Sequence, residues 1–296
     1  MSGYFLFTIL SAFFLALQGA LMAVHFRNID ELSTVAYRGL SLGISFAPLL
    51  LLVPEEAFGT FLSTQIPMLL FAGFIAAFAN TCAGISLRKL TVALANTIGF
   101  SAAALMSLLI DVFVYERSFS LYQLGLIALL FVTLFFFSVG DGKRSLVREG
   151  GILVGVGYAA VFGFLIGIAG AMVGELSKGS HPFVIGYTWE VAIGTFALFY
   201  CFVRKALGGE GFSVIPLRTF GSILLYASPT AAGTGLYLYA LTLGPLAIVS
   251  ALQSTIMVFS LFFGALIFKE RFGSRELILL LVITSLVIAL RYVSVG

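Results

Sequence analysis

Charged residues are scarce in this chain: Asp, Glu, Lys and Arg make up 10% of its 296 residues. A soluble domain typically carries about 25% charged residues and about 45–50% apolar ones. Here the apolar set AVILMFWYC reaches 60%, and the mean hydropathy is +1.13. A soluble fold could not bury that much apolar surface, so the composition excludes a soluble domain and indicates an integral membrane protein.

Residues and motifs that would indicate covalent chemistry are also missing. The only two cysteines, Cys82 and Cys201, fall inside apolar stretches, which favours small buried or lipid-facing residues over a disulfide or a metal site. The sequence has no His/Cys/Asp cluster, no glycine-rich phosphate loop and no pair of catalytic carboxylates. We therefore expect no catalytic residue, no cofactor, no metal ion and no nucleic-acid partner.

Ten apolar segments are long enough to cross a hydrocarbon core of about 30 Å as helices. No Lys or Arg precedes the first of them, so we expect a permanent helix there rather than a signal peptide. Helices are expected throughout, because lipid-exposed backbone must pair internally and no alternating barrel pattern is present. The segments are residues 4–24, 33–53, 66–87, 91–114, 120–140, 152–173, 183–203, 219–241, 247–268 and 275–294.

The two halves of the sequence match each other at an offset of 154 residues. Ala93 then falls on Ala247, and the Glu-Arg pair at 116–117 falls on the Glu-Arg pair at 270–271. In both halves a start rich in small residues leads into a long apolar run, the Glu-Arg pair and another apolar helix.

These matches predict an all-α membrane protein of ten transmembrane helices, built as two five-helix repeats. We expect the first repeat over 1–140, a polar linker over 141–150 and the second repeat over 151–296. Because five is an odd number, the two copies must point in opposite directions across the membrane. Inverted repeats of this kind are common among secondary transporters.

The stretches LAIVSALQSTIMVFSLFFGALIFKERFGSRELILLLVI and VALANTIGFSAAALMSLLIDVFVYERSFSLYQLGLIALL resemble the motif of the EamA family, in the drug/metabolite transporter superfamily. In helix count and repeat length the resemblance covers the whole chain. At the level of sequence motifs it covers only two helix pairs, the fourth with the fifth and the ninth with the tenth. Neither copy has the proline that the family often carries inside this helix. The resemblance implies carrier-type transport of metabolites, often export, of many different substrates.

The distribution of basic residues predicts an orientation. Even-numbered loops hold two Lys or Arg, whereas odd-numbered loops hold twelve, which places the odd loops in the cytoplasm and both termini outside. The family resemblance implies the opposite, with both termini cytoplasmic. The twelve are Arg27, Arg88, Lys89, Lys143, Arg144, Arg148, Arg204, Lys205, Arg218, Lys269, Arg271 and Arg275.

Glu190 lies about seven residues into the seventh segment, roughly 10 Å along its axis at ~1.5 Å per residue. A charged group at such depth costs at least ~2.5–3.5 kcal/mol, which makes it a functional candidate. It either binds a substrate amine or a proton, with Tyr187 and Trp189 as aromatic neighbours, or it is a structural Glu paired with a basic residue.

Arg38 follows Tyr37 near one end of the second segment. Its planar guanidinium suits a carboxylate or a phosphate; alternatively it snorkels to the interface or pairs with Asp30 or Glu31. Segments two and seven are counterparts if a pseudo-two-fold axis relates the repeats. Arg38 and Glu190 would then face one cavity, and a zwitterion such as an amino acid would suit both.

Four uncharged polar side chains inside predicted helices complete the candidate substrate-binding set. Each either lines the cavity or forms an interhelical hydrogen bond, a contact of about 0.6 kcal/mol on average in membranes. These residues are Gln18, Asn80, Asn96 and Gln253.

Three further patterns predict local structure. Pro48 and Pro229 remove backbone donors and should kink the second and eighth helices. Gly163 and Gly167 in the sixth segment should let a neighbouring helix approach closely. Asp111 lies near the end of the fourth segment, where we expect it to be solvated.

Taken together, these patterns predict a multi-pass carrier of a plasma or bacterial inner membrane, as a monomer or homodimer. It would move a small organic solute, such as an amino acid or related metabolite, by alternating access through a central cavity, with a coupling proton as a further partner. One alternative is a proton-coupled exporter of drugs or organic cations. The other, an embedded enzyme or scaffold, lacks catalytic motifs and large soluble loops.

Overall fold

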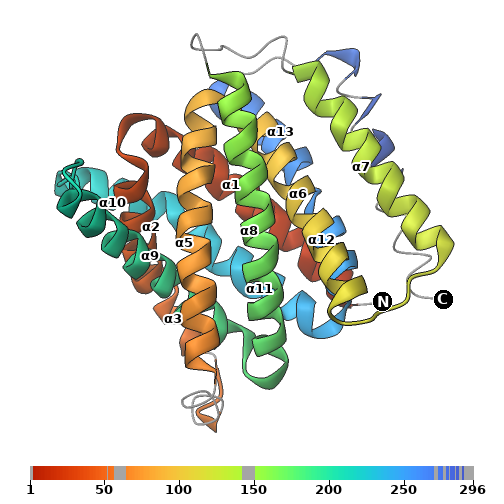
Figure 1. Cartoon of the computed structure of the whole chain (residues 1–296), viewed down its shortest axis with the longest axis horizontal. Coiled ribbons are helices and arrows are strands. Elements are labelled where there is room, and N and C mark those ends of the chain that lie inside the picture. Colours follow the sequence, from red (N-terminus) through yellow and green to blue (C-terminus); the bar gives the residue numbers. More distant parts are fainter. Residues whose placement is uncertain are drawn as a thin grey trace.

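The computed structural model is a bundle of α-helices (Figure 1). It describes residues 3–51, 53–56, 65–141, 151–269, 273–275, 278–279, 281–283, 285–286 and 289, and these ranges contain no strand. Within these ranges, six helical stretches are long and apolar enough to cross a membrane. They are α1 (Gly3–Asn28), α5 (Ile66–Lys89), α6 (Val92–Phe113), α8 (Ile152–Gly179), α9 (Pro182–Ala206) and α12 (Leu246–Gln253) taken with α13 (Ile256–Phe268).

The other predicted segments form shorter or interrupted helices. Segment 120–140 forms α7 (Leu121–Asp141), at the edge of the bundle in Figure 1. Most of segment 275–294 and of the linker 141–150 lies outside the described residues. The all-α membrane class is confirmed, whereas ten spanning helices and an inverted repeat stay predictions. The interrupted segments are α2 (Glu31–Ser45) with α3 (Ala47–Leu50), and α10 (Leu217–Ala227) with α11 (Pro229–Leu243).

Both predicted proline breaks are confirmed. Pro48 lies in the first turn of α3, and Pro229 begins α11, positions where a missing backbone N–H costs no helical hydrogen bond. A third break separates α12 from α13 at Ser254 and Thr255, which form a turn. No proline accompanies this break, and it places Gln253 at the end of a short buried helix.

Glycines bring helices from the two halves of the chain into backbone contact. A Cβ atom on Gly163 of α8 would lie 2.1 Å from the carbonyl oxygen of Gly99 in α6. A Cβ on Gly39 of α2 would lie 2.2 Å from the Cα of Gly194 in α9. Any larger residue would therefore push these helices apart. The close approach predicted for Gly163 is confirmed, and the α2–α9 crossing is a second contact of the same kind.

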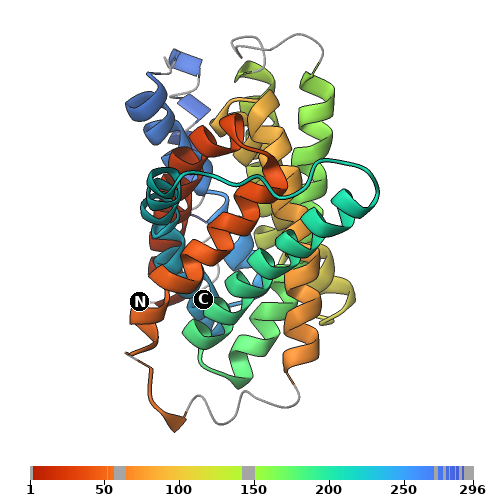
Figure 2. The ribbon, with the colours of Figure 1, turned by 90° about the vertical axis from the view of Figure 1, so that its left-hand side faces the viewer.

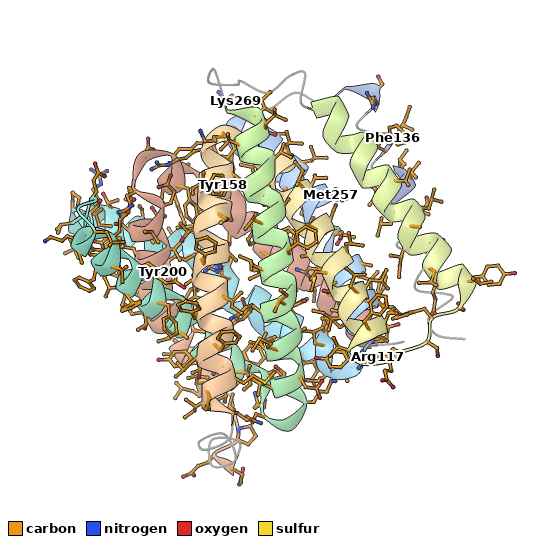
Figure 3. All side chains as sticks on the ribbon, viewed as in Figure 1. Arg117, Phe136, Tyr158, Tyr200, Met257 and Lys269 are labelled. Carbon is orange, nitrogen blue, oxygen red and sulfur yellow. The ribbon has the colours of Figure 1, made fainter. Side chains whose placement is uncertain are left out.

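The connections between helices gather at two opposite ends of the bundle. Figure 3 shows Lys269 at one end and Arg117 at the other. The first, third and seventh connections meet at the end that we call the odd-loop end, where the loop 207–216 runs across the start of α2 (Figure 2). At the even-loop end, the hydroxyl of Ser180 donates to the side-chain oxygen of Gln65 at 2.6 Å.

Candidate functional site

A cavity of about 150 Å³ lies in the centre of the bundle, between helices of both halves. Seven of the nine predicted binding residues line it, and they come from six different helices. Small, aliphatic and aromatic residues complete the wall. The seven are Gln18 on α1, Arg38 on α2, Asn80 on α5, Asn96 on α6, Trp189 and Glu190 on α9, and Gln253 on α12.

Arg38 and Glu190 form an ion pair at this cavity. The Nη1 atom of Arg38 lies 3.0 Å from Oε2 of Glu190, and its Nη2 atom donates to Oε1 at 3.3 Å. The hydroxyl of Thr234 on α11 also donates to Oε1, at 2.8 Å. Both charged side chains are over 90% buried, so each is compensated almost entirely by the other.

The helix crossing explains why these two side chains meet. Arg38 precedes Gly39, and Glu190 lies one turn before Gly194, where the backbones of α2 and α9 touch. The interpretation that Arg38 pairs with Asp30 or Glu31 is wrong. Those acids instead form ion pairs at the odd-loop end, Asp30 with Arg204 at 2.6 Å and Glu31 with Arg88 at 2.7 Å.

The amide side chains contact both the cavity and the protein. Nδ2 of Asn80 donates to the carbonyl oxygen of Ala76 at 2.8 Å, and Nδ2 of Asn96 donates to the hydroxyl of Ser260 at 2.8 Å. Nε2 of Gln253 donates to the hydroxyl of Ser11 at 3.2 Å. These residues therefore act as interhelical or local hydrogen-bond donors while they line the cavity, so the two interpretations of them are not exclusive.

Tyr37 and Tyr187 do not line the cavity. Tyr37 lies about 100° around α2 from Arg38 and faces away from the cavity. Its hydroxyl instead donates to the carbonyl oxygen of Ser213 at 3.0 Å, and its ring packs on Phe212. Tyr187 packs edge-on against Phe46. Both tyrosines thus join α2, α3 and the loop 207–216 around the site rather than within it.

The cavity extends further towards the odd-loop end. Its lining reaches Phe26 and Leu87, each two residues before the end of its helix. In the opposite direction it reaches Ser107 and Tyr237, six residues before α6 and α11 end, and Ser250, four residues after α12 begins. A solute in the cavity is therefore separated from the even-loop end by a thicker layer of packed side chains.

Asp111 is a residue whose role the sequence did not indicate, and the expectation that it is solvated is wrong. Its side chain is 0% exposed. Oδ2 accepts a hydrogen bond from the backbone N–H of Ala247 at 2.6 Å, and Oδ1 accepts one from Arg117 at 2.8 Å. Asp111 on α6 thus satisfies a free N–H in the first turn of α12, joining the two halves at the even-loop end.

No three His, Cys, Asp or Glu side chains within the described ranges are grouped as a metal site requires. The structure combines helices that are long and apolar enough to cross a membrane with a central cavity that holds a buried ion pair. These features define a multi-pass membrane protein with an internal solute-sized site.

Comparisons with known proteins agree with this class. The model of the EamA-like transporter family matches residues 153–291. A crystal structure of another protein has a TM-score of 0.68 and 10% sequence identity, and the match covers 96% of this chain and 94% of that one. At that identity the likeness establishes the fold alone. A search of curated proteins found no match.

Residues 153–291 thus match the EamA-like transporter family, which belongs to the drug/metabolite transporter superfamily. The match indicates a membrane transporter of the drug/metabolite type. Members of the family are generally not enzymes.

Proposed function

We propose that the chain is a secondary carrier that moves a small zwitterionic solute, an amino acid or related metabolite, by alternating access through the central cavity. The observation that carries this proposal is the ion pair of Arg38 and Glu190 at the cavity wall. One partner comes from each half of the chain, so a solute bound by both would contact both halves.

The charge of the cavity favours a zwitterion over a singly charged solute. Arg38 and Glu190 compensate each other, and removing one partner from a buried pair is strongly destabilising, by about 3–5 kcal/mol. A lone cation at Glu190 would displace Arg38 and leave it uncompensated. The carboxylate and ammonium of an amino acid would instead replace both halves of the pair at once.

The same argument separates the carrier from a proton-coupled exporter of lipophilic cations. Such an exporter needs a carboxylate that protons and cations can occupy in turn. Glu190 is occupied by Arg38 and Thr234 instead. A proton-antiport assay with lipophilic cations distinguishes the two, because a zwitterion carrier should not respond to them.

We place the odd-loop end in the cytoplasm, on the excess of Lys and Arg in the odd loops. The cavity would then lie closer to the cytoplasmic face and load from it during export. A reporter fused to Gly296 tests this orientation. If the odd-loop end is cytoplasmic, the C-terminus and the reporter should lie outside the cytoplasm.

The transport proposal is tested by thermal unfolding of the purified protein with each amino acid, followed by uptake into proteoliposomes. A substrate at ~100 times its Kd should stabilise the carrier by about 2.7 kcal/mol. Arg38→Gln and Glu190→Gln should abolish both effects, and Lys205→Gln, an exposed charge on the same helix as Glu190, should leave them unchanged. Unaltered transport by both cavity variants would overturn the proposal.

A further inference from the structure

The amide side chains of the cavity present the same chemical group. Asn80 and Asn96 come from α5 and α6, and Gln253 comes from the end of α12. In each residue the NH₂ group donates to a protein oxygen: Ala76, Ser260 and Ser11, respectively. The three amides are thereby fixed with their nitrogen atoms towards the protein.

Their oxygen atoms are left as acceptors. Oε1 of Gln253 is buried and has no hydrogen-bond partner among the described residues. Likewise, within that part of the chain, no residue donates to the side-chain oxygen of Asn80 or Asn96. An amide oxygen can accept two hydrogen bonds. We call these three residues the acceptor wall.

Donors of the same cavity come from two other helices, α2 and α9. Arg38 carries five N–H donors, only part of which Glu190 uses. The indole Nε1 of Trp189, next to Glu190 in sequence, is buried and also has no partner among the described residues. The cavity therefore has unused donors on α2 and α9 and unused acceptors on α5, α6 and α12.

We infer that the solute carries hydrogen-bond donors on its side group, in addition to its charged carboxylate and ammonium. The carboxylate would face Arg38 and Trp189, the ammonium Glu190, and the side group the acceptor wall. The solute class is a zwitterion with a hydroxyl, amide or amine side group, rather than an aliphatic one. This inference rests on the proposed carriage of zwitterions and adds which of them are selected.

Isosteric amino acids test the inference on the unaltered protein. Threonine and valine differ by a hydroxyl in place of a methyl, and asparagine and leucine differ by an amide in place of a branched alkyl group. A site built to hydrogen-bond a substrate group strongly rejects the analogue that lacks it. Binding measured by thermal shift should therefore favour threonine over valine, and asparagine over leucine, by at least about tenfold.

Variants assign the preference to the acceptor wall. Asn80→Leu and Asn96→Leu should reduce it to about twofold or less by weakening the polar member of each pair and not the aliphatic one. Asn28→Leu is a matched control, because Nδ2 of Asn28 donates to the carbonyl oxygen four residues earlier, as in Asn80, but away from the cavity. It should keep the preference of the unaltered protein.

The outcomes separate the inference from the proposed function. Equal binding of threonine and valine, and of asparagine and leucine, would overturn the inference and leave a zwitterion carrier intact. A preference that survives both wall variants would also overturn it. If no amino acid of any kind binds, the proposed function itself fails.

Discussion

The two ends of the bundle hold its halves together by different means. At the even-loop end, the fully buried Asp111 joins α6 to the backbone of α12, with Arg117 on its other oxygen. At the odd-loop end, one ion pair joins the halves and a second lies within the first half. Their carboxylates are 10% and 17% exposed, and their arginines are 30% and 34% exposed, close to the 30% of Arg117. These pairs are Asp30–Arg204 and Glu31–Arg88.

This contrast indicates which end of the protein is held closed more strongly. When its partners leave, a carboxylate shielded from water keeps its full desolvation penalty without compensation. In a partly exposed pair, water and salt ions can replace the lost partner. The cavity also extends further towards the odd-loop end. Under the proposed alternating access, this conformation has its even-loop end closed, and opening that end requires Asp111 to release α12.

The largest effect is expected at Asp111. Asp111→Ala should lower the free energy of unfolding by about 1–3 kcal/mol, because it leaves the buried backbone N–H of Ala247 without its acceptor and Arg117 without its partner. Thermal unfolding in detergent measures this. Asp111→Asn keeps an acceptor oxygen for Ala247 and should lose less. An alanine variant as stable as the unaltered protein would contradict the closed-end interpretation.

Asp30 should have a smaller effect at the opposite end. Asp30 also caps α2, accepting from the backbone N–H of Ser33 at 2.9 Å. Asn is an equally good cap, so Asp30→Asn loses only the pair with Arg204 and should cost about 1 kcal/mol or less. Asp30→Ala loses the cap as well, and should cost about 1 kcal/mol more. Equal losses in the two variants would show that the cap contributes nothing.

The Asp30 pair also predicts a dependence on pH. Burial alone would raise the pKa of Asp30, but hydrogen bonds from Arg204 and Ser33 outweigh it and hold the pKa below its ordinary value of 3.8. A carboxyl with a lowered folded pKa adds stability above its unfolded pKa and loses it as the pH falls further. Unfolding midpoints should therefore fall more steeply below about pH 4 in the unaltered protein than in Asp30→Asn. Parallel curves would contradict this.

The smallest effect is expected at Glu31. Its pair with Arg88 lies partly in solvent, and Arg88 also donates to the carbonyl oxygens of Phe26 and Ile29, which hold it in place. Glu31→Gln should cost about 0.2–1 kcal/mol in dilute buffer and almost nothing at 1 M salt. The loss at Asp111→Ala should not change with salt. A salt-independent loss at Glu31 would remove the contrast between the ends.

Much of the fold could be predicted because it depends on one-dimensional signals. Runs of apolar residues predict helices, and Pro48 and Pro229 mark where they break. The break at Ser254 and Thr255 could not be predicted, because neither residue excludes a helix. The position of Asp111 near a helix end also failed to predict its burial, because the backbone N–H that binds it belongs to Ala247, far away in the sequence.

The candidate site was predictable in its residue types and not in its contacts. Charge within an apolar segment identifies Arg38 and Glu190, but their pairing joins positions 152 residues apart and depends on the α2–α9 crossing. Tyr37 and Tyr187 were chosen for closeness in sequence, and the helical turn directs them elsewhere. The direction in which each amide points is set by its hydrogen-bond partner, which composition does not reveal.

Trp189 gives the cavity an intrinsic fluorescent probe. It is the only tryptophan in the chain, it lines the cavity, and its indole N–H has no partner among the described residues. Excitation at the red edge of indole absorption avoids the tyrosines, so the remaining emission comes from one wall of the binding site. A solute that hydrogen-bonds this indole should shift the emission without any label, which makes the unaltered protein its own reporter of occupancy.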